Sequence, residues 1–174
     1  MTDAAKLRTR AATPADASAI AAIYNEGIAD RIATFETEPR SSTDIAGWLT
    51  GEHLVVVAET GETSPVAFAA SFPYSSRPCY RGIGEFSVYV RRDCRGRRAG
   101  RAVLAALIEA AAKRGMHKLT SRVFPENAAS RALLKGLGFE EIGIHRRHGQ
   151  LDGRWRDCVI VERLLGNGAG EGHQ

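Results

Sequence analysis

The 174-residue sequence has few cysteines, few aromatic residues and no long hydrophobic run. Its three cysteines, Cys79, Cys94 and Cys158, are odd in number, widely spaced and without histidines close by in the sequence. This pattern argues against a disulfide framework and against a zinc site, so we expect reduced thiols and no bound metal. No apolar run approaches the roughly 20 residues that a bilayer span requires, and the N-terminal region is polar, so we expect a cytoplasmic protein.

Basic charge is concentrated in one short segment. Six arginines fall within residues 91–101 with one acid, Asp93, so the segment carries a net charge of +5 whereas the whole chain carries +4. Nucleic-acid binding is one alternative, but its usual signature is a spread of cations interleaved with aromatic residues, which make up 7% of this chain. Gly96 and Gly100 let backbone N–H groups approach a ligand, and a helix start adds unpaired donors, so the segment favours a phosphate group.

Apolar periodicity predicts one mixed α+β domain. A hydrophobic content of 44% is enough for a single core, and we expect a domain over residues 1–165 followed by a disordered tail over 166–174. Strands are predicted at Leu7–Ala11, Leu54–Ala58, Val66–Phe72, Gly84–Val90, Lys118–Phe124, Glu141–His145 and Asp157–Leu164. Helices are predicted after Thr13, over Ser42–Gly51, from Gly100 to Lys113 and after Asn127. This order predicts a mixed, mostly antiparallel sheet flanked by helices.

Seven short motifs occur in an ordered series along the chain. They are TFETEP at 34–39, RPCYR at 77–81, EFSVYV at 85–90, RGRRAG at 95–100, NAAS at 127–130, LGF at 137–139 and GRW at 153–155. In this order they resemble the GCN5-related N-acetyltransferases (GNAT), and within them the phosphinothricin and arsinothricin N-acetyltransferase group. The resemblance implies a GNAT fold, acetyl-CoA as cofactor and a homodimer.

The resemblance also implies a cofactor site. The loop that would hold the pyrophosphate comprises Arg95, Gly96, Arg97, Arg98, Ala99, Gly100 and Arg101. Backbone near Val88, Tyr89 and Val90 would pair with the pantetheine arm, and Asn127 and Ser130 would contact the cofactor. Asn127 has an alternative role as a helix N-cap, which is a common use of asparagine.

Two positions depart from the family pattern. Relatives usually carry glycine where this chain has Arg98, and we expect Arg98 to adopt an ordinary negative φ. Where the family often has a tyrosine or histidine that protonates the departing thiolate, this chain has Leu134, so the general acid is unassigned.

Glu85 is the candidate general base. Alternation puts it on the same strand face as Ser87 and Tyr89, and an amine must lose a proton before it can attack a thioester. An ordinary solvated carboxylate is the alternative, and the match to the family's proposed catalytic glutamate favours the base. With no Cys/His pair at a recognisable spacing, we expect direct transfer in a ternary complex.

Aromatic and cationic residues in irregular segments are candidates for binding the acceptor substrate. They are Phe35, Tyr74, Arg77, Tyr80 and Arg81. Guanidinium groups bind carboxylate, phosphinate or arsonate oxygens bidentately, so this set suits a small amino acid with an extra anionic group. A surface rim is the alternative, and His145 and His148 are interpreted as polar surface or interface residues.

The sequence thus predicts an N-acetyltransferase that acts on the α-amino group of a glutamate-like antimetabolite such as phosphinothricin, arsinothricin or methionine sulfoximine. Alternatives are a protein or peptide N-terminal acetyltransferase, a catalytically silent CoA-binding sensor, and a basic nucleic-acid-binding module.

Overall fold

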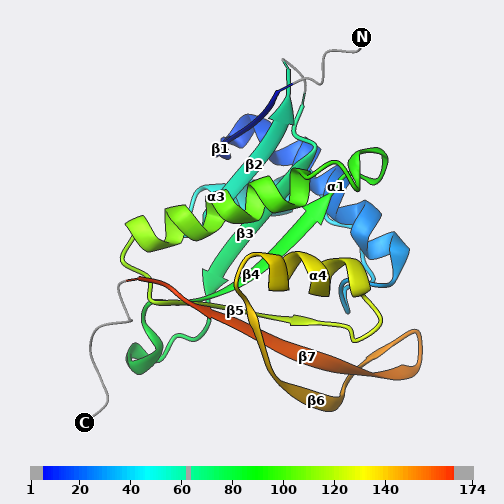
Figure 1. Ribbon diagram of the computed structural model, residues 1–174. Helices are drawn as coiled ribbons and strands as arrows, with labels where there is room; N and C mark the ends of the chain where they lie inside the picture. Colours follow the sequence, from blue (N-terminus) through cyan, green and yellow to red (C-terminus); the bar gives the residue numbers. More distant parts are fainter. Residues whose placement is uncertain (1–5, 62–63, 167–174) are drawn as a thin grey trace.

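A seven-stranded sheet forms the centre of the computed structural model, which describes residues 6–61 and 64–166 (Figure 1). The strands are β1 (Leu7–Ala11), β2 (Leu54–Thr60), β3 (Ala67–Pro73), β4 (Ile83–Val90), β5 (Lys118–Val123), β6 (Glu140–Leu151) and β7 (Arg154–Leu164). Their spatial order is β1-β2-β3-β4-β5-β7-β6, and neighbours are antiparallel except β4 and β5, which run parallel. The predicted mostly antiparallel α+β architecture is therefore confirmed.

Helices cover both faces of the sheet. Helices α1 (Ala17–Asp30) and α2 (Ser42–Leu49) lie on one face, and α3 (Ala99–Lys113) and α4 (Ala128–Gly136) on the other (Figure 1). Three short 3₁₀ turns, η1 (Pro14–Asp16), η2 (Pro78–Tyr80) and η3 (Arg92–Cys94), connect elements. The helical spacing of Ile20 and Ile23 buries one side of α1 against Phe68 of β3, while Leu104 and Leu107 bury α3 on the opposite face.

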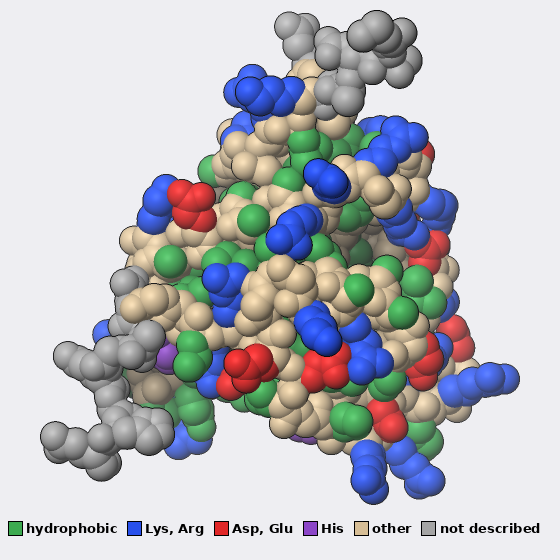
Figure 2. All heavy atoms as spheres, viewed as in Figure 1, with side chains coloured by type: hydrophobic (Ala, Val, Ile, Leu, Met, Phe, Trp, Pro, Cys, Tyr) green, Lys and Arg blue, Asp and Glu red, His purple; other side chains and the backbone are tan. Residues whose placement is uncertain are grey.

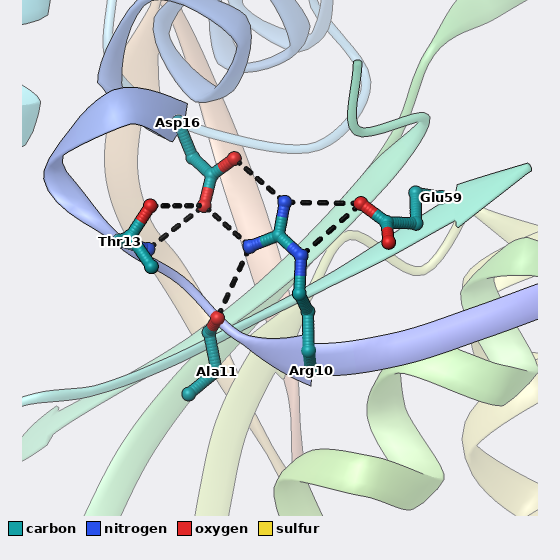
Figure 3. A network of polar contacts seen from close by, with 5 residues as sticks. All are labelled: Arg10, Ala11, Thr13, Asp16 and Glu59. Atoms are coloured by element: carbon teal, nitrogen blue, oxygen red, sulfur yellow. Dashed lines mark hydrogen bonds and ion pairs between the residues drawn. The ribbon is translucent and has the colours of Figure 1, made fainter. Parts of the chain in front are cut away.

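A buried carboxylate fastens β1 to the start of α1 (Figure 3). The Arg10 guanidinium donates to both oxygens of Asp16, at 2.7 and 3.0 Å, and its Nε donates to Glu59 at 3.1 Å. The Thr13 backbone N–H also donates to Asp16, which completes the predicted capping arrangement. Hydrogen bonding from Arg10 holds the pKa of Asp16 below its ordinary value, although burial acts in the opposite direction.

The last two strands are longer than the sequence predicted. Strands β6 and β7 form a hairpin whose turn, at Asp152 and Gly153, has positive φ at both residues. Two register shifts interrupt the pairing of β6, and most of its side chains are exposed on either face, so the apolar alternation that identifies a strand is weak there. The predicted disordered tail, apart from Gly166, lies outside the described residues.

Candidate active site

The candidate site begins where β4 and β5 separate. Their register pairs are Ile83–Lys118, Gly84–Leu119 and Glu85–Thr120. Both strands continue, to Val90 and Val123, yet within the described residues no further register pair joins them. The β4 backbone after Glu85 therefore faces an opening, called here the β4–β5 gap, at the start of which the Ser121 hydroxyl donates to the Phe86 carbonyl at 2.7 Å.

A cavity of about 540 Å³ lies beside this gap, on the face of the sheet that carries α1. Four segments line it: Tyr24 with Ala33–Glu36, then Glu85–Ser87 with Tyr89, then Ser121, Arg122 and Phe124, and finally His148–Gln150 with Cys158. Cavities of this size bind small molecules, and the mixture of aromatic walls with a few charged groups is typical of such sites.

Glu85 forms an ion pair with Arg122 in this cavity. The same guanidinium contacts His148, with Nη1 3.2 Å from the imidazole Nε2. A guanidinium can only donate hydrogen bonds, so this contact requires an unprotonated Nε2. Carboxylate, guanidinium and imidazole therefore form one polar row along the cavity wall.

The imidazole of this row is held in its neutral form. Partial desolvation lowers the pKa of His148, and the neighbouring charges of His145 and Arg122 lower it further. The rings of His145 and His148 stack with centroids 4.3 Å apart. His148 therefore remains an acceptor toward Arg122 at neutral pH.

Phe35 forms an apolar wall of the cavity. Its ring meets Phe124 edge to face, with centroids 4.9 Å apart, and packs beside Leu151 and Cys158. A Cβ atom built on Gly149 would lie 2.9 Å from the Phe35 ring, so the hairpin can approach this closely because that residue is glycine. The hairpin and the loop after α1 thus enclose the cavity together.

Two phenols lie deeper in the cavity. Tyr24 and Tyr89 are buried, and their rings meet edge to face at 4.9 Å. Burial raises the pKa of both phenols. Both hydroxyls therefore carry their protons at neutral pH and can donate hydrogen bonds.

Three of the six clustered arginines are already paired with acids. Arg91 pairs with Asp93 at 2.6 Å, and Arg92 and Arg95 both pair with Asp30 of α1 at 2.7 Å. Burial opposes ionisation of Asp30, but hydrogen bonds from the two arginines outweigh it and lower the pKa. Arg97 and Arg98 are exposed, so the charge that a ligand can reach is smaller than the sequence suggests. Figure 2 shows Lys and Arg side chains around the loop that leads into α3.

The expected negative φ at Arg98 is wrong. Arg98 is the N-cap of α3 and lies in the left-handed region, with φ 66° and ψ 4°, and Gly96 has φ 75°. The chain turns sharply between η3 and α3, and these two residues make the bend. A left-handed conformation costs a residue with a side chain about 1–2 kcal/mol, which glycine avoids.

The first turn of α3 packs closely on its neighbours. A Cβ atom on Gly100 would lie 3.2 Å from the Val90 side chain, and the Arg101 guanidinium donates to the Gly136 carbonyl of α4 at 3.2 Å. The N–H groups of Ala99, Gly100 and Arg101 have no acceptor within the helix because they belong to its first turn. The predicted loop residues therefore lie together directly after β4, at the far end of the β4–β5 gap from Glu85.

Asn127 serves as an N-cap and also ties two parts of the site together. Its side chain accepts from the Ser130 N–H and donates to the Ile32 carbonyl, both at 3.2 Å. Helix α4 is thereby linked to the loop that lines the cavity. Leu134 is buried in the core beneath α4, so no proton donor stands at that position.

The predicted acceptor-binding residues do not gather in one place. Phe35 lines the cavity, whereas the remaining four lie on the connection between β3 and β4, outside the lining formed by the described residues. There Tyr74 meets Tyr80 at 5.6 Å and Arg77 lies 5.7 Å from the Tyr80 ring centre, with Arg81 exposed beside them. This connection precedes β4, whereas the gap opens along the later part of that strand.

Sequence reasoning missed Tyr24, Arg122 and His148 as cavity residues. Tyr24 lies on an apolar helical stripe and is indistinguishable there from a core residue. Arg122 and His148 are 26 residues apart and meet only because the β6–β7 hairpin folds back beside β5. The sequence predicted a strand that ends at His145, whereas β6 continues to Leu151 and brings His148 near Arg122.

Comparisons with known proteins agree with this geometry. A sequence model described as "Acetyltransferase (GNAT) family" matches residues 20–139. A Pseudomonas paraeruginosa protein named L-methionine sulfoximine/L-methionine sulfone acetyltransferase is 32% identical over 160 residues, which cover 90% of this chain and 93% of that protein. A solved ribosomal-protein-alanine N-acetyltransferase from Brucella melitensis is 36% identical with a TM-score of 0.86, covering 91% of this chain and 99% of that one. A GNAT superfamily phosphinothricin acetyltransferase from Sinorhizobium meliloti, solved in complex with AcCoA, is 28% identical with a TM-score of 0.87, covering 97% of this chain and 93% of that one. The chain belongs to the GNAT acetyltransferase family and is an acyltransferase.

Proposed function

We propose that this protein uses acetyl-CoA to acetylate the α-amino group of a small glutamate-like amino acid, and thereby confers resistance to it. Methionine sulfoximine, phosphinothricin and arsinothricin are the candidate substrates. The observation that carries the proposal is the cavity of about 540 Å³ in which Glu85 stands at the start of the β4–β5 gap. The names of the Pseudomonas and Sinorhizobium relatives support the first two substrates.

The loop entering α3 fits acetyl-CoA. First-turn N–H groups and the exposed Arg97 and Arg98 suit the diphosphate, and the open edge of Val88–Val90 suits the amides of the pantetheine arm. Acetyl-CoA supplies the acetyl group as a thioester, so that transfer forms an amide N–C bond, breaks the C–S bond and leaves free CoA thiol. Ser130 and Asn127, at the start of α4, lie on the same face of the sheet as this loop.

Glu85 accepts the proton that the substrate ammonium must lose before its nitrogen can attack. Phe35 forms one wall of the cavity beside that transfer, and backbone N–H groups along the gap polarise the carbonyl under attack. The phenols of Tyr24 and Tyr89, which carry their protons, lie in this cavity, whereas Leu134, buried beneath α4 on the other face of the sheet, has no proton to donate.

The charges of the cavity favour a substrate with one carboxylate. Glu85 attracts an ammonium group, Glu36 is already paired with Arg40 at 2.8 Å, and among the described lining residues Arg122 is the one arginine or lysine. Phosphinothricin carries a second anionic group that would meet no further cation there. We therefore expect a higher kcat/KM for methionine sulfoximine than for phosphinothricin.

The Brucella neighbour keeps peptide N-terminal acetylation as a second candidate. A peptide needs an open groove, whereas here the Phe35 loop and the hairpin at Gly149 meet over the cavity. Nucleic-acid binding is disfavoured by the pairing of Arg92 and Arg95 with Asp30. Acetylation of a small amino acid therefore remains the proposed function.

We also propose a cytoplasmic homodimer. Cys79, Cys94 and Cys158 are free thiols, as is usual in reducing compartments. Within the described residues, no helix has both the length and the apolar character needed to cross a membrane. The hairpin at this edge of the sheet exposes Ile142 and Ile144 on the edge strand β6 and Trp155 on β7, and such exposed apolar residues suit a contact with a second copy.

Thiol release from acetyl-CoA tests the proposed function. Purified protein is assayed against methionine sulfoximine, phosphinothricin, arsinothricin, glutamate, polyamines and peptides that begin with alanine. We expect turnover with the glutamate analogues and little with peptides. Turnover confined to the peptides would replace the proposed function by the second candidate.

A further inference from the structure

The base proposed for the reaction is already occupied. Glu85 is ion-paired with Arg122, and the two side chains are 38% and 41% exposed, so water and small solutes can reach the pair. An oxygen of this carboxylate already accepts a hydrogen bond from the guanidinium, so an ammonium proton must compete with Arg122 for it. Catalysis by Glu85 therefore requires that its partner be drawn away when the substrate arrives.

The geometry allows the substrate to do this itself. Arg122 is the one arginine or lysine among the described residues that line the cavity, so a substrate carboxylate entering it meets this guanidinium. Guanidinium groups hold carboxylates through two parallel hydrogen bonds. Glu85 and a substrate carboxylate thus compete for the same donors.

His148 keeps the guanidinium in place during such an exchange. Its neutral Nε2 accepts from Nη1 of Arg122, while the contact with Glu85 uses Nη2. The stacked ring of His145 holds the His148 imidazole on the hairpin. Arg122 therefore stays hydrogen-bonded to His148 at the cavity wall when its ion pair with Glu85 breaks. This second anchor makes exchange of one partner possible without loss of the side chain's position.

We propose that Arg122 is the residue that recognises the substrate's α-carboxylate, and that this ion-pair exchange releases Glu85 to act as the base. The inference rests on the proposed function and adds to it a residue that selects amino acids over simple amines. The step balances as follows: the substrate carboxylate replaces Glu85 on Arg122, and one proton passes from the ammonium to Glu85, which later releases it to solvent. The neutral nitrogen forms the N–C bond as the C–S bond breaks, and the second proton that the nitrogen then loses passes to the departing thiolate, which leaves as free CoA thiol.

The test compares methionine sulfoximine with the matching amine that lacks its carboxylate. Wild type, Arg122→Gln, Arg122→Lys and the matched control Arg8→Gln, an exposed arginine on the distant strand β1, are measured for turnover and, by calorimetry, for binding of each compound without acetyl-CoA. Wild type and the control should prefer the amino acid by about 10- to 100-fold, as expected for loss of a charge-assisted pair.

Arg122→Gln should abolish that preference in two ways. The KM and the dissociation constant of methionine sulfoximine should rise about 10- to 100-fold, whereas kcat for the carboxylate-free amine should increase because Glu85 is unpaired from the start. Arg122→Lys, which keeps the charge but loses the planar pair of donors, should give an intermediate preference.

Either of two results would overturn this inference and leave the proposed function standing. One is equal use of both compounds by wild type, which needs no variant to fold. The other is an equal loss for both compounds in Arg122→Gln, which would make Arg122 a structural residue. If wild type turns over none of the glutamate analogues while peptides are acetylated, the proposed function fails and the inference fails with it.

Discussion

Replacing Gly149 by alanine tests whether the hairpin and the Phe35 loop enclose the site as the structure indicates. The new Cβ would lie 2.9 Å from two Phe35 ring carbons and 3.2 Å from a third, whereas carbon atoms normally pack at about 3.5–4.0 Å. The ring cannot withdraw freely, because Phe124 stands against it at 4.9 Å between centroids. We therefore expect an overpacking penalty of about 1–3 kcal/mol.

Calorimetry and kinetics measure the two consequences of Gly149→Ala. For a chain of this length each kcal/mol lowers the melting temperature by about 2–4 °C, so the variant should melt about 2–12 °C lower. The KM for the amino acid should rise because Phe35 is a cavity wall, while acetyl-CoA affinity should stay unchanged because the helix starts of α3 and α4, which are proposed to hold the cofactor, lie on the other face of the sheet.

Controls separate this clash from a general effect of the methyl group. Gly47→Ala adds a Cβ with no heavy atom within 4 Å, inside helix α2, and should not lower stability. The double variant Gly149→Ala/Phe35→Leu should recover part of the loss because the smaller side chain yields space. An unchanged melting temperature, or strict additivity of the two substitutions, would refute the reasoning.

Three other substitutions give independent checks. Glu85→Gln should lower kcat by a factor on the order of 10²–10⁴ and leave calorimetric acetyl-CoA binding intact, and an unaltered pH–rate profile would remove Glu85 from the mechanism. Asp16→Asn should destabilise the fold by about 1–3 kcal/mol at pH 7 in urea titrations. Because the folded-state pKa of Asp16 is lowered, its contribution is complete above the ordinary carboxyl pKa and is lost as the pH falls through the folded value, so wild type and variant should converge in acid. Arg98→Gly should raise stability by up to about 1 kcal/mol by relieving the left-handed conformation, whereas Arg98→Ala, which keeps the Cβ, should not.

Sequence patterns predicted the fold well where a strand or helix depends on residues that are close in the sequence. The Thr13–Asp16 capping pair, the amphipathic stripes of α1 and α3 and the alternation of β4 all depend on residues close in sequence, and all are found. Alternation also placed Glu85 on the face that lines the cavity.

Pairings between distant residues were beyond local signals. The arginine cluster looked like a free positive segment because Asp30, which binds Arg92 and Arg95, lies 62 and 65 residues away on α1. Arg98 took a left-handed conformation because the bend into α3 is set by packing of the helix on β4, which outweighs the local cost. Tyr74 and Arg77 are residue types common in binding sites, yet they lie on the connection before β4 and outside the described lining of the cavity.

The single parallel pair in the sheet explains why one strand can serve both halves of the reaction. A parallel connection from β4 to β5 needs a crossover helix, and α3 provides it, so the first-turn N–H groups of α3 must follow directly after Val90. At about 3.3 Å per residue, the five steps from Glu85 to Val90 separate the proposed base from that anion-binding loop by about 17 Å. The register pairing with β5 ends at Glu85, so among the described residues the β4 backbone between these points has no strand partner on that side, although side chains of Ser121 and Arg95 reach the carbonyls of Phe86 and Val90. The base and the helix start are thus fixed to opposite ends of one rigid strand, which β3 pairs from Gly84 to Val90, and their separation cannot change without breaking that ladder.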